Sequence, residues 1–166
     1  MSLEWFHYAG RPITLNPSRR YTLDRADKPS GLWISPATED GWRAWREGKE
    51  CGIPETEYVY RVDLSPDANL LVVKPHEISR LHQRFPRRRM DKIMPFYPYD
   101  EDHPSWETIT EQFDGVLIPR YSWDHRLSVN WYYGWDCASG CIWNLRAISG
   151  FDCTGILHAK AKEAVA

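Results

Sequence analysis

The sequence predicts an α+β fold in which short strands outnumber helices. Apolar runs of strand length follow one another along the chain, each bounded by turn-forming residues. Few segments carry apolar residues at helical spacing, and these do not alternate regularly with the strands, which argues against a doubly wound parallel sheet. A length of 166 residues without a linker or internal repeat predicts that residues 1–166 form a single domain.

The predicted strands are recognised by alternation of apolar and polar residues, or by a short uninterrupted apolar run. Residues 58–64 alternate most clearly, because Tyr58, Tyr60 and Val62 are separated by residues that face the other side. Pro36 closes the strand that begins at Gly31. The predicted strands are Leu3–Tyr8, Gly31–Ser35, Tyr58–Leu64, Asn69–Val73, Gly115–Ile118 and Cys141–Ile148.

A few short helices complete the prediction. Thr38 is a capping residue ahead of a helix that carries Trp42 and Trp45 three residues apart on one face. Residues 75–85 have apolar side chains at helical spacing, and Ser105 opens another helix. The aromatic segment 128–136 fits neither pattern, residues 10–29 and 95–104 are predicted loops, and residues 159–166 are predicted to be a frayed helical tail.

Charge and hydropathy narrow the class of protein. The 21 Lys and Arg residues are balanced by 23 Asp and Glu residues, which gives a net charge of -2 and a pI near 6.3. This balance excludes a protein held on nucleic acid mainly by overall positive charge, but it leaves room for a local basic patch. No apolar run reaches the roughly 18 residues of a membrane span. Residues 1–10 also lack a signal-peptide layout, so we expect a soluble, cytoplasmic protein without membrane contact.

The aromatic content is the unusual feature of the composition, with 9 Trp, 9 Tyr and 5 Phe residues. Trp is too large to bury completely, and its N–H needs a partner. Such rings line pockets for flat ligands or stack on bases, and they also occur half-exposed around a small β-rich core. Both interpretations stay open at this stage.

The four cysteines, Cys51, Cys137, Cys141 and Cys153, are predicted to be free thiols. Cys137, Cys141 and Cys153 together with His158 would be enough ligands for a zinc ion. Their spacing does not match the usual two-residue knuckle, and a predicted strand lies between them. We therefore expect buried thiols and no metal.

The better-known nucleotide and hydrolase motifs are absent from the sequence. The remaining candidates are residues that follow one another along the chain in a recognisable order. His7 stands at the end of the first strand, a second strand follows at residues 31–35, and a short helix then carries Trp42 and Trp45. This order resembles the NAD-binding half of the ADP-ribosyltransferase fold, particularly the branch that includes diphtheria toxin and the poly(ADP-ribose) polymerases. The resemblance implies two small packed, mainly antiparallel sheets with about two or three short helices.

The resemblance also implies roles for individual residues. His7 would bind the adenosine ribose, and the backbone at Tyr8 and Ala9 would hold the nicotinamide amide. In the second strand, Gly31, Trp33 and Ser35 would line the NAD site, with Trp33 at the position of a family Tyr. Either Trp45 or Trp42 would stack on the nicotinamide ring.

The catalytic glutamate of the family has no counterpart here. The sequence reads Ser139-Gly140-Cys141 at that position, and the nearest acid is Asp136. Cleavage of a nicotinamide–ribose bond passes through an oxocarbenium-like state, so a ring clamp, a ribose anchor and nearby negative charge are needed. His7 is the candidate anchor, because a neutral imidazole offers one donor and one acceptor, and Asp136 is the candidate charge. Together they form the predicted catalytic pair.

The implied activity is transfer of ADP-ribose from NAD to a macromolecular acceptor, protein or nucleic acid, with release of nicotinamide. Small enzymes of this kind are common among toxins and phage-encoded modifiers, where a protein partner can neutralise them. One alternative is a non-catalytic module that binds a nucleotide or a protein. Another is a nucleic-acid-binding protein that uses the Arg87–Arg89 run and exposed rings. Arg120, Arg126 and this run could contact the pyrophosphate of a dinucleotide or the backbone of RNA or DNA, and rings such as Tyr97, Tyr99 and Trp106 could stack on bases.

Each of these residues also has a purely structural interpretation. His7 could be a hydrogen-bonded core histidine, and Trp33, Trp42 and Trp45 could be core packing. Asp136 could cap a turn, and the Arg87–Arg89 run could be a solvated surface.

Overall fold

The structure of the chain is a computed structural model that describes residues 3–22, 28–48, 56–87 and 102–158. The strands are β1 (Trp5–Ala9), β2 (Leu32–Pro36), β3 (Thr56–Leu64), β4 (Leu70–Val72), β5 (Gly115–Ile118), β6 (Ser139–Ile142) and β7 (Ile148–His158). The α-helices are α1 (Trp42–Glu47), α2 (Leu81–Arg84), α3 (Trp106–Gln112) and α4 (Trp123–Arg126). The 3₁₀ helices are η1 (Pro75–Arg80), η3 (Asn130–Tyr132) and η4 (Leu145–Ala147).

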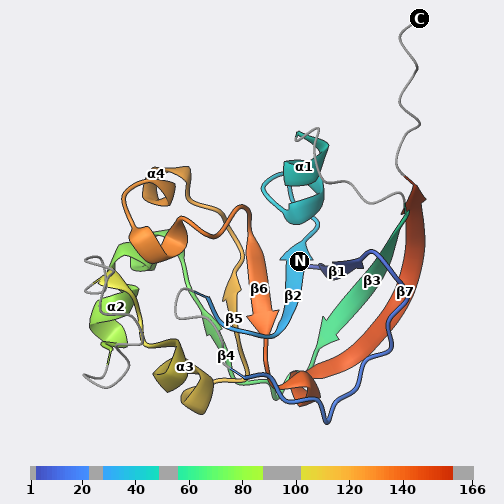
Figure 1. Cartoon of the computed structure of the whole chain (residues 1–166), viewed down its shortest axis with the longest axis horizontal. Coiled ribbons are helices and arrows are strands. Elements are labelled where there is room, and N and C mark those ends of the chain that lie inside the picture. Colours follow the sequence, from blue (N-terminus) through green and yellow to red (C-terminus); the bar gives the residue numbers. More distant parts are fainter. Residues whose placement is uncertain (1–2, 23–27, 49–55, 88–101, 159–166) are drawn as a thin grey trace, which may run out of the picture.

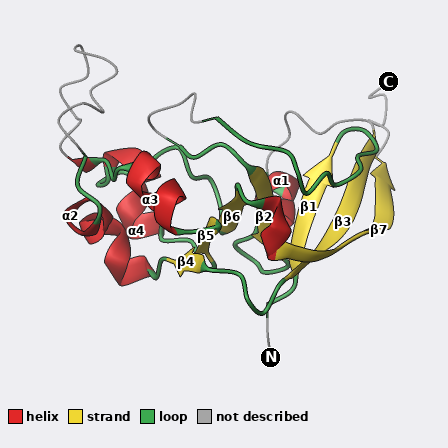
Figure 2. Ribbon diagram, turned by 90° about the horizontal axis from the view of Figure 1, so that it is seen from below, coloured by secondary structure: helices red, strands yellow, loops and turns green. Residues whose placement is uncertain are grey.

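The predicted α+β class is confirmed, but the expectation of two packed sheets is wrong. The strands form one seven-stranded sheet in the order β4-β5-β6-β2-β1-β3-β7 (Figure 1). The pair β4–β5 is parallel, and the other neighbours are antiparallel. Helices α2, α3 and α4 gather beside the β4–β5–β6 half, whereas β1, β3 and β7 extend away from them (Figures 1 and 2).

The two halves are joined by a short contact between β1 and β2. Only Trp5 with Pro36 and Phe6 with Ser35 are paired there, whereas β3 and β7 pair along most of their length. The sheet is therefore continuous, but its two halves are joined only by these two residue pairs. This weak join is where the candidate site lies.

The end of the chain differs most from the prediction. The expected strand 141–148 is two strands, because β6 ends at Ile142 and β7 begins at Ile148. The Asn144 side chain accepts a hydrogen bond from the Arg146 amide and starts the 3₁₀ turn between them. Sequence reasoning missed β7 itself, because most of this edge strand is exposed and lacks apolar alternation.

Other predicted segments agree more closely with the structure. Ser105 caps α3 by accepting a hydrogen bond from the Thr108 amide, as expected. The predicted helix 75–85 forms as a 3₁₀ turn followed by one α-helical turn. The aromatic segment 128–136 contains η3 and carries Trp131, Tyr132 and Trp135, each 1% exposed or less. The loop 95–104 is described only from residue 102, and the tail 159–166 lies outside the described residues.

The core lies on both faces of the central strands. Ile34 on β2 and Ile142 on β6 pack with Trp5 and Val62 on one face. On the other face, helices α2 and α3 and the aromatic segment cover β5 and β6, and the large buried rings gather there. Many of the aromatic residues are thus part of the core packing.

Strands β5 and β6 pack so closely at Gly140 that a larger residue there is expected to destabilise the fold. A Cβ added there would lie 2.5 Å from Leu117 Cδ2 and 2.9 Å from the Val116 carbonyl oxygen. Gly140→Ala is expected to lower the free energy of unfolding by about 1–3 kcal/mol through overpacking. Gly155→Ala in β7 is the control, since nothing lies within 4 Å of its Cβ position, and it is expected to change stability by less than about 0.5 kcal/mol. Equal chemical denaturation curves for the two variants would contradict this packing.

Candidate functional site

A cavity of about 370 Å³ opens where β1 and β2 separate. Strands β1 and β2, the start of α1 and the loop before β6 supply most of its wall. Its lining residues are Phe6, His7, Tyr8, Lys28, Trp33, Ile34, Ser35, Trp42, Gly134, Trp135, Asp136, Cys137 and Ser139. Its size and its mix of rings with a few polar groups are typical of a small-molecule site.

The separation of the strands is visible in the hydrogen bonds. The Ala37 amide donates to the Glu4 carbonyl, so even-numbered residues of β1 direct their backbone polar groups toward β2. A continued ladder would therefore pair the Tyr8 amide with the Trp33 carbonyl. Instead, His7 Nδ1 lies 2.7 Å from that carbonyl oxygen and takes this hydrogen bond. The backbone of Tyr8 is left facing the space between the strands.

His7 is held as a neutral imidazole with a defined tautomer. A carbonyl oxygen can only accept, so Nδ1 carries the proton in its bond to Trp33. Burial lowers the pKa of His7 below its usual value of 6.5, and the bond to Trp33 opposes this only in part. The rings of Tyr60 and Phe151 lie 6.4 and 6.1 Å from the imidazole. In this tautomer Nε2 is an acceptor for a hydroxyl or an N–H.

Trp33 and Trp42 provide aromatic walls for the cavity. The Trp33 ring meets Trp135 edge to face at 4.9 Å, which fixes its orientation. Trp42 stacks on Trp45 at 5.1 Å with an interplanar angle of 22°. Of the two candidates for stacking on a ligand ring, Trp42 lines the cavity, and Trp45 lies behind it, outside the lining.

The Ser35 hydroxyl ties three parts of the site together. It donates to the Ala138 carbonyl at 2.7 Å and accepts from the Trp42 amide at 2.7 Å. Strand β2, helix α1 and the loop before β6 are therefore fixed to one another through one buried side chain. A buried ion pair between Arg46 and Glu57 holds α1 to β3 in addition.

Asp136 lines the cavity but shares its charge with a neighbour. Its Oδ1 lies 3.0 Å from a guanidinium nitrogen of Arg126. The same guanidinium donates to the Tyr121 hydroxyl, which in turn donates to the Trp135 carbonyl. The hydrogen bonds to Tyr121 and Asp136 raise the pKa of Arg126, so its guanidinium stays charged. The carboxylate is thus well positioned but partly neutralised.

The thiols at the site are not activated. Burial raises the pKa of Cys137 to about 12, and the nearby Asp136 charge adds to this shift. Burial raises the pKa of Cys141 as well. Neither thiol is ionised at neutral pH, so neither is suited to nucleophilic attack.

Besides Trp45, two predicted site residues lie outside the cavity lining, Ala9 and Gly31. Ala9 pairs with Tyr58 across β1 and β3. Gly31 packs against β6, where a Cβ would lie 2.6 Å from Cys141 Sγ, so close packing explains the glycine. Sequence reasoning missed Lys28, whose Nζ lies 5.5 Å from the Trp33 ring centroid, and gave no role to Trp135.

The described part of the chain contains no group of three or more His, Cys, Asp or Glu side chains placed to hold a metal ion. Cys137 and Cys141 are buried free thiols, Cys153 is an exposed one, and Cys51 lies outside the described residues. In the same part of the chain, every helix is too short or too polar to cross a bilayer.

The chain matches no protein-family model, no curated protein and no solved structure.

The lowered pKa of His7 predicts a pH dependence of stability. In the unfolded chain His7 binds a proton near pH 6.5, whereas in the folded protein it does so only at lower pH. The folded state therefore loses stability as the pH falls below about 6.5. Denaturant unfolding at a series of pH values is expected to show this loss in the native protein and a smaller one in His7→Asn, which keeps a donor near the Trp33 carbonyl. Parallel curves for the two proteins would contradict a buried, neutral His7.

Proposed function

We propose that the cavity binds NAD and that the protein is an ADP-ribosyltransferase-like enzyme. One observation carries the proposal. His7 and Tyr8 from one strand, Trp33 from the next strand and Trp42 from the following helix line one cavity where two strands separate. The nicotinamide ring lies against Trp42, its amide meets the backbone at Tyr8, and Nε2 of His7 accepts from a ribose hydroxyl. This arrangement gives the ring clamp and the ribose anchor that the reaction needs.

In the proposed reaction, the bond between nicotinamide and C1′ of the ribose breaks. The electron pair leaves with nicotinamide, and positive charge develops at C1′ and the ring oxygen. The Asp136 carboxylate stabilises this charge, and a nucleophile of the acceptor then forms the new bond to C1′ while its proton passes to solvent or a nearby base. Trp33 and Trp135 keep water away from the reacting carbon.

Binding of NAD is expected to raise the melting temperature. At an NAD concentration 100-fold above Kd, the gain is about 2.7 kcal/mol, or roughly 5–10 °C for a domain of this size. His7→Ala and Trp42→Ala are each expected to abolish the shift. Trp123→Ala is the matched control, because Trp123 is 64% exposed and lies outside the cavity lining. A flat calorimetric titration of the native protein with NAD would refute the proposal.

A non-catalytic NAD-binding module is the second candidate. The ion pair between Asp136 and Arg126 favours it, because a paired carboxylate stabilises developing positive charge less well than a free one. The two candidates agree on NAD binding and differ only in whether nicotinamide is released.

Substitution of Asp136 separates the two candidates. If the protein is an enzyme, Asp136→Asn is expected to lower nicotinamide release on the order of 100-fold and to leave the NAD-induced thermal shift nearly unchanged. Nicotinamide is measured by chromatography after incubation with NAD and cell lysate. Binding of NAD by the native protein without any nicotinamide release would assign the chain to the non-catalytic class.

A further inference from the structure

Two further cavities continue from the Lys28 side of the NAD cavity. The first, about 480 Å³, shares Lys28 and Trp33 with the NAD cavity. The second, about 430 Å³, shares Arg20, Tyr21 and Ser30 with the first. We call the two together the basic groove, since their linings hold the four cationic side chains Arg19, Arg20, Lys28 and Arg146.

The charge of the basic groove is not compensated within the described residues. No described Asp or Glu lines either cavity, and none forms an ion pair with the four cations. The nearby Asp114 carboxylate accepts hydrogen bonds from Asn69 and Asn144 instead. Among the described residues, this groove is thus a local concentration of positive charge on a chain whose net charge is -2.

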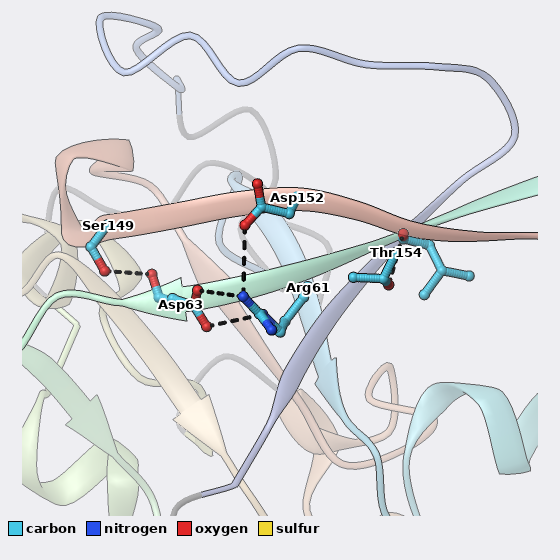
Figure 3. A network of polar contacts seen from close by, with 6 residues as sticks. Arg61, Asp63, Ser149, Asp152 and Thr154 are labelled. Carbon is cyan, nitrogen blue, oxygen red and sulfur yellow. Dashed lines mark hydrogen bonds and ion pairs between the residues drawn. The ribbon is translucent and has the colours of Figure 1, made fainter.

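An arginine on the other half of the sheet shows the contrast. Arg61 on β3 lies between Asp63 and Asp152, at 3.4 and 3.8 Å, so its charge is balanced by its neighbours (Figure 3). Arg19 and Lys28 in the groove meet aromatic faces instead, with Arg19 4.8 Å from the Tyr21 ring and Lys28 5.5 Å from the Trp33 ring. In the described part of the chain, no carboxylate neutralises their charge.

The wall of the groove is built on the sheet. The Pro29 carbonyl accepts a hydrogen bond from the buried Cys141 thiol of β6, and Gly31 packs against the same strand. Beside Arg146, the indole N–H of Trp143 donates to the Phe113 carbonyl and fixes that ring. Pro29 and Gly31 therefore hold one end of the groove against β6, and Trp143 holds the other end to the segment before β5.

We propose that the basic groove binds a single strand of nucleic acid and leads it to the NAD cavity. Separate cations spaced along adjoining cavities suit successive phosphates better than a single anion, and the partly exposed Tyr21 ring, which lines both cavities, suits a base. The proposal that a nucleic-acid strand binds depends on the groove alone. The role of the strand as the acceptor of ADP-ribose rests on the proposed function, with NAD held on the β1 side and the strand entering past Lys28 and Trp33.

The test is fluorescence anisotropy with labelled single-stranded RNA and DNA of about eight nucleotides. Affinity is expected to fall as salt rises from about 50 to 200 mM. The double variant Arg20→Ala with Arg146→Ala removes two phosphate contacts. It is expected to lower the slope of log affinity against log salt by about 1.4, which corresponds to about 25-fold weaker binding at 0.1 M salt. Arg61→Ala, which removes a cation whose charge is already balanced, is expected to bind like the native protein.

The outcomes separate this proposal from the proposed function. Trp42→Ala is expected to lose the NAD-induced thermal shift and keep strand binding, whereas the double arginine variant is expected to do the reverse. The groove proposal is overturned by oligonucleotide binding that is undetectable, independent of salt or unchanged in the double variant. It is also overturned if that variant loses NAD binding alone, or if an acidic peptide binds the groove better than the strands do. Thermal melts of each variant check that it is folded.

Discussion

The candidate site depends on one unmade ladder bond between β1 and β2. Backbone carbonyls in the interior must be paired, so strands that separate leave groups that something else has to satisfy. The ring of His7 does so for Trp33. Because the His7 ring replaces the Tyr8 amide as the donor to Trp33, the sheet stays continuous through two residue pairs and still opens a cavity in its middle. Without a side chain of that shape and donor geometry, closure of the ladder would fill the space.

The high aromatic content is divided between two tasks. Trp131, Tyr132 and Trp106 lie in the core beside β5 and β6. Their large rings fill the space that longer helices would cover in a larger domain. Trp33 and Trp42 belong to the cavity wall. Trp135 takes part in both, since it is buried and meets Trp33 edge to face. Core and site are thus one packed structure, which stiffens the cavity.

Sequence reasoning did well where the signal was local. The alternation in β3, the apolar run of β5 and the Ser105 cap could each be read from a few neighbouring residues. It failed for β7, whose pairing with β3 is a long-range contact made by a mostly exposed segment. The single sheet was also missed, because strand order depends on contacts between distant segments.

The same division holds for the site. The order of His7, Trp33 and Trp42 along the chain was enough to predict that they line one site, and all three line the cavity. The ion pair of Asp136 with Arg126 could not be foreseen, since nothing in the spacing says which cation meets which acid. The basic groove could not be foreseen either, because Arg20 and Arg146 are far apart in the sequence and come to line one cavity only in the folded chain. Trp33 borders both the cavity between β1 and β2 and the basic groove, so any tilt of its indole by one occupant changes the surface offered to the other. Such coupling is reciprocal by thermodynamic necessity, and a single shared ring is enough to make the two occupancies cooperative or antagonistic.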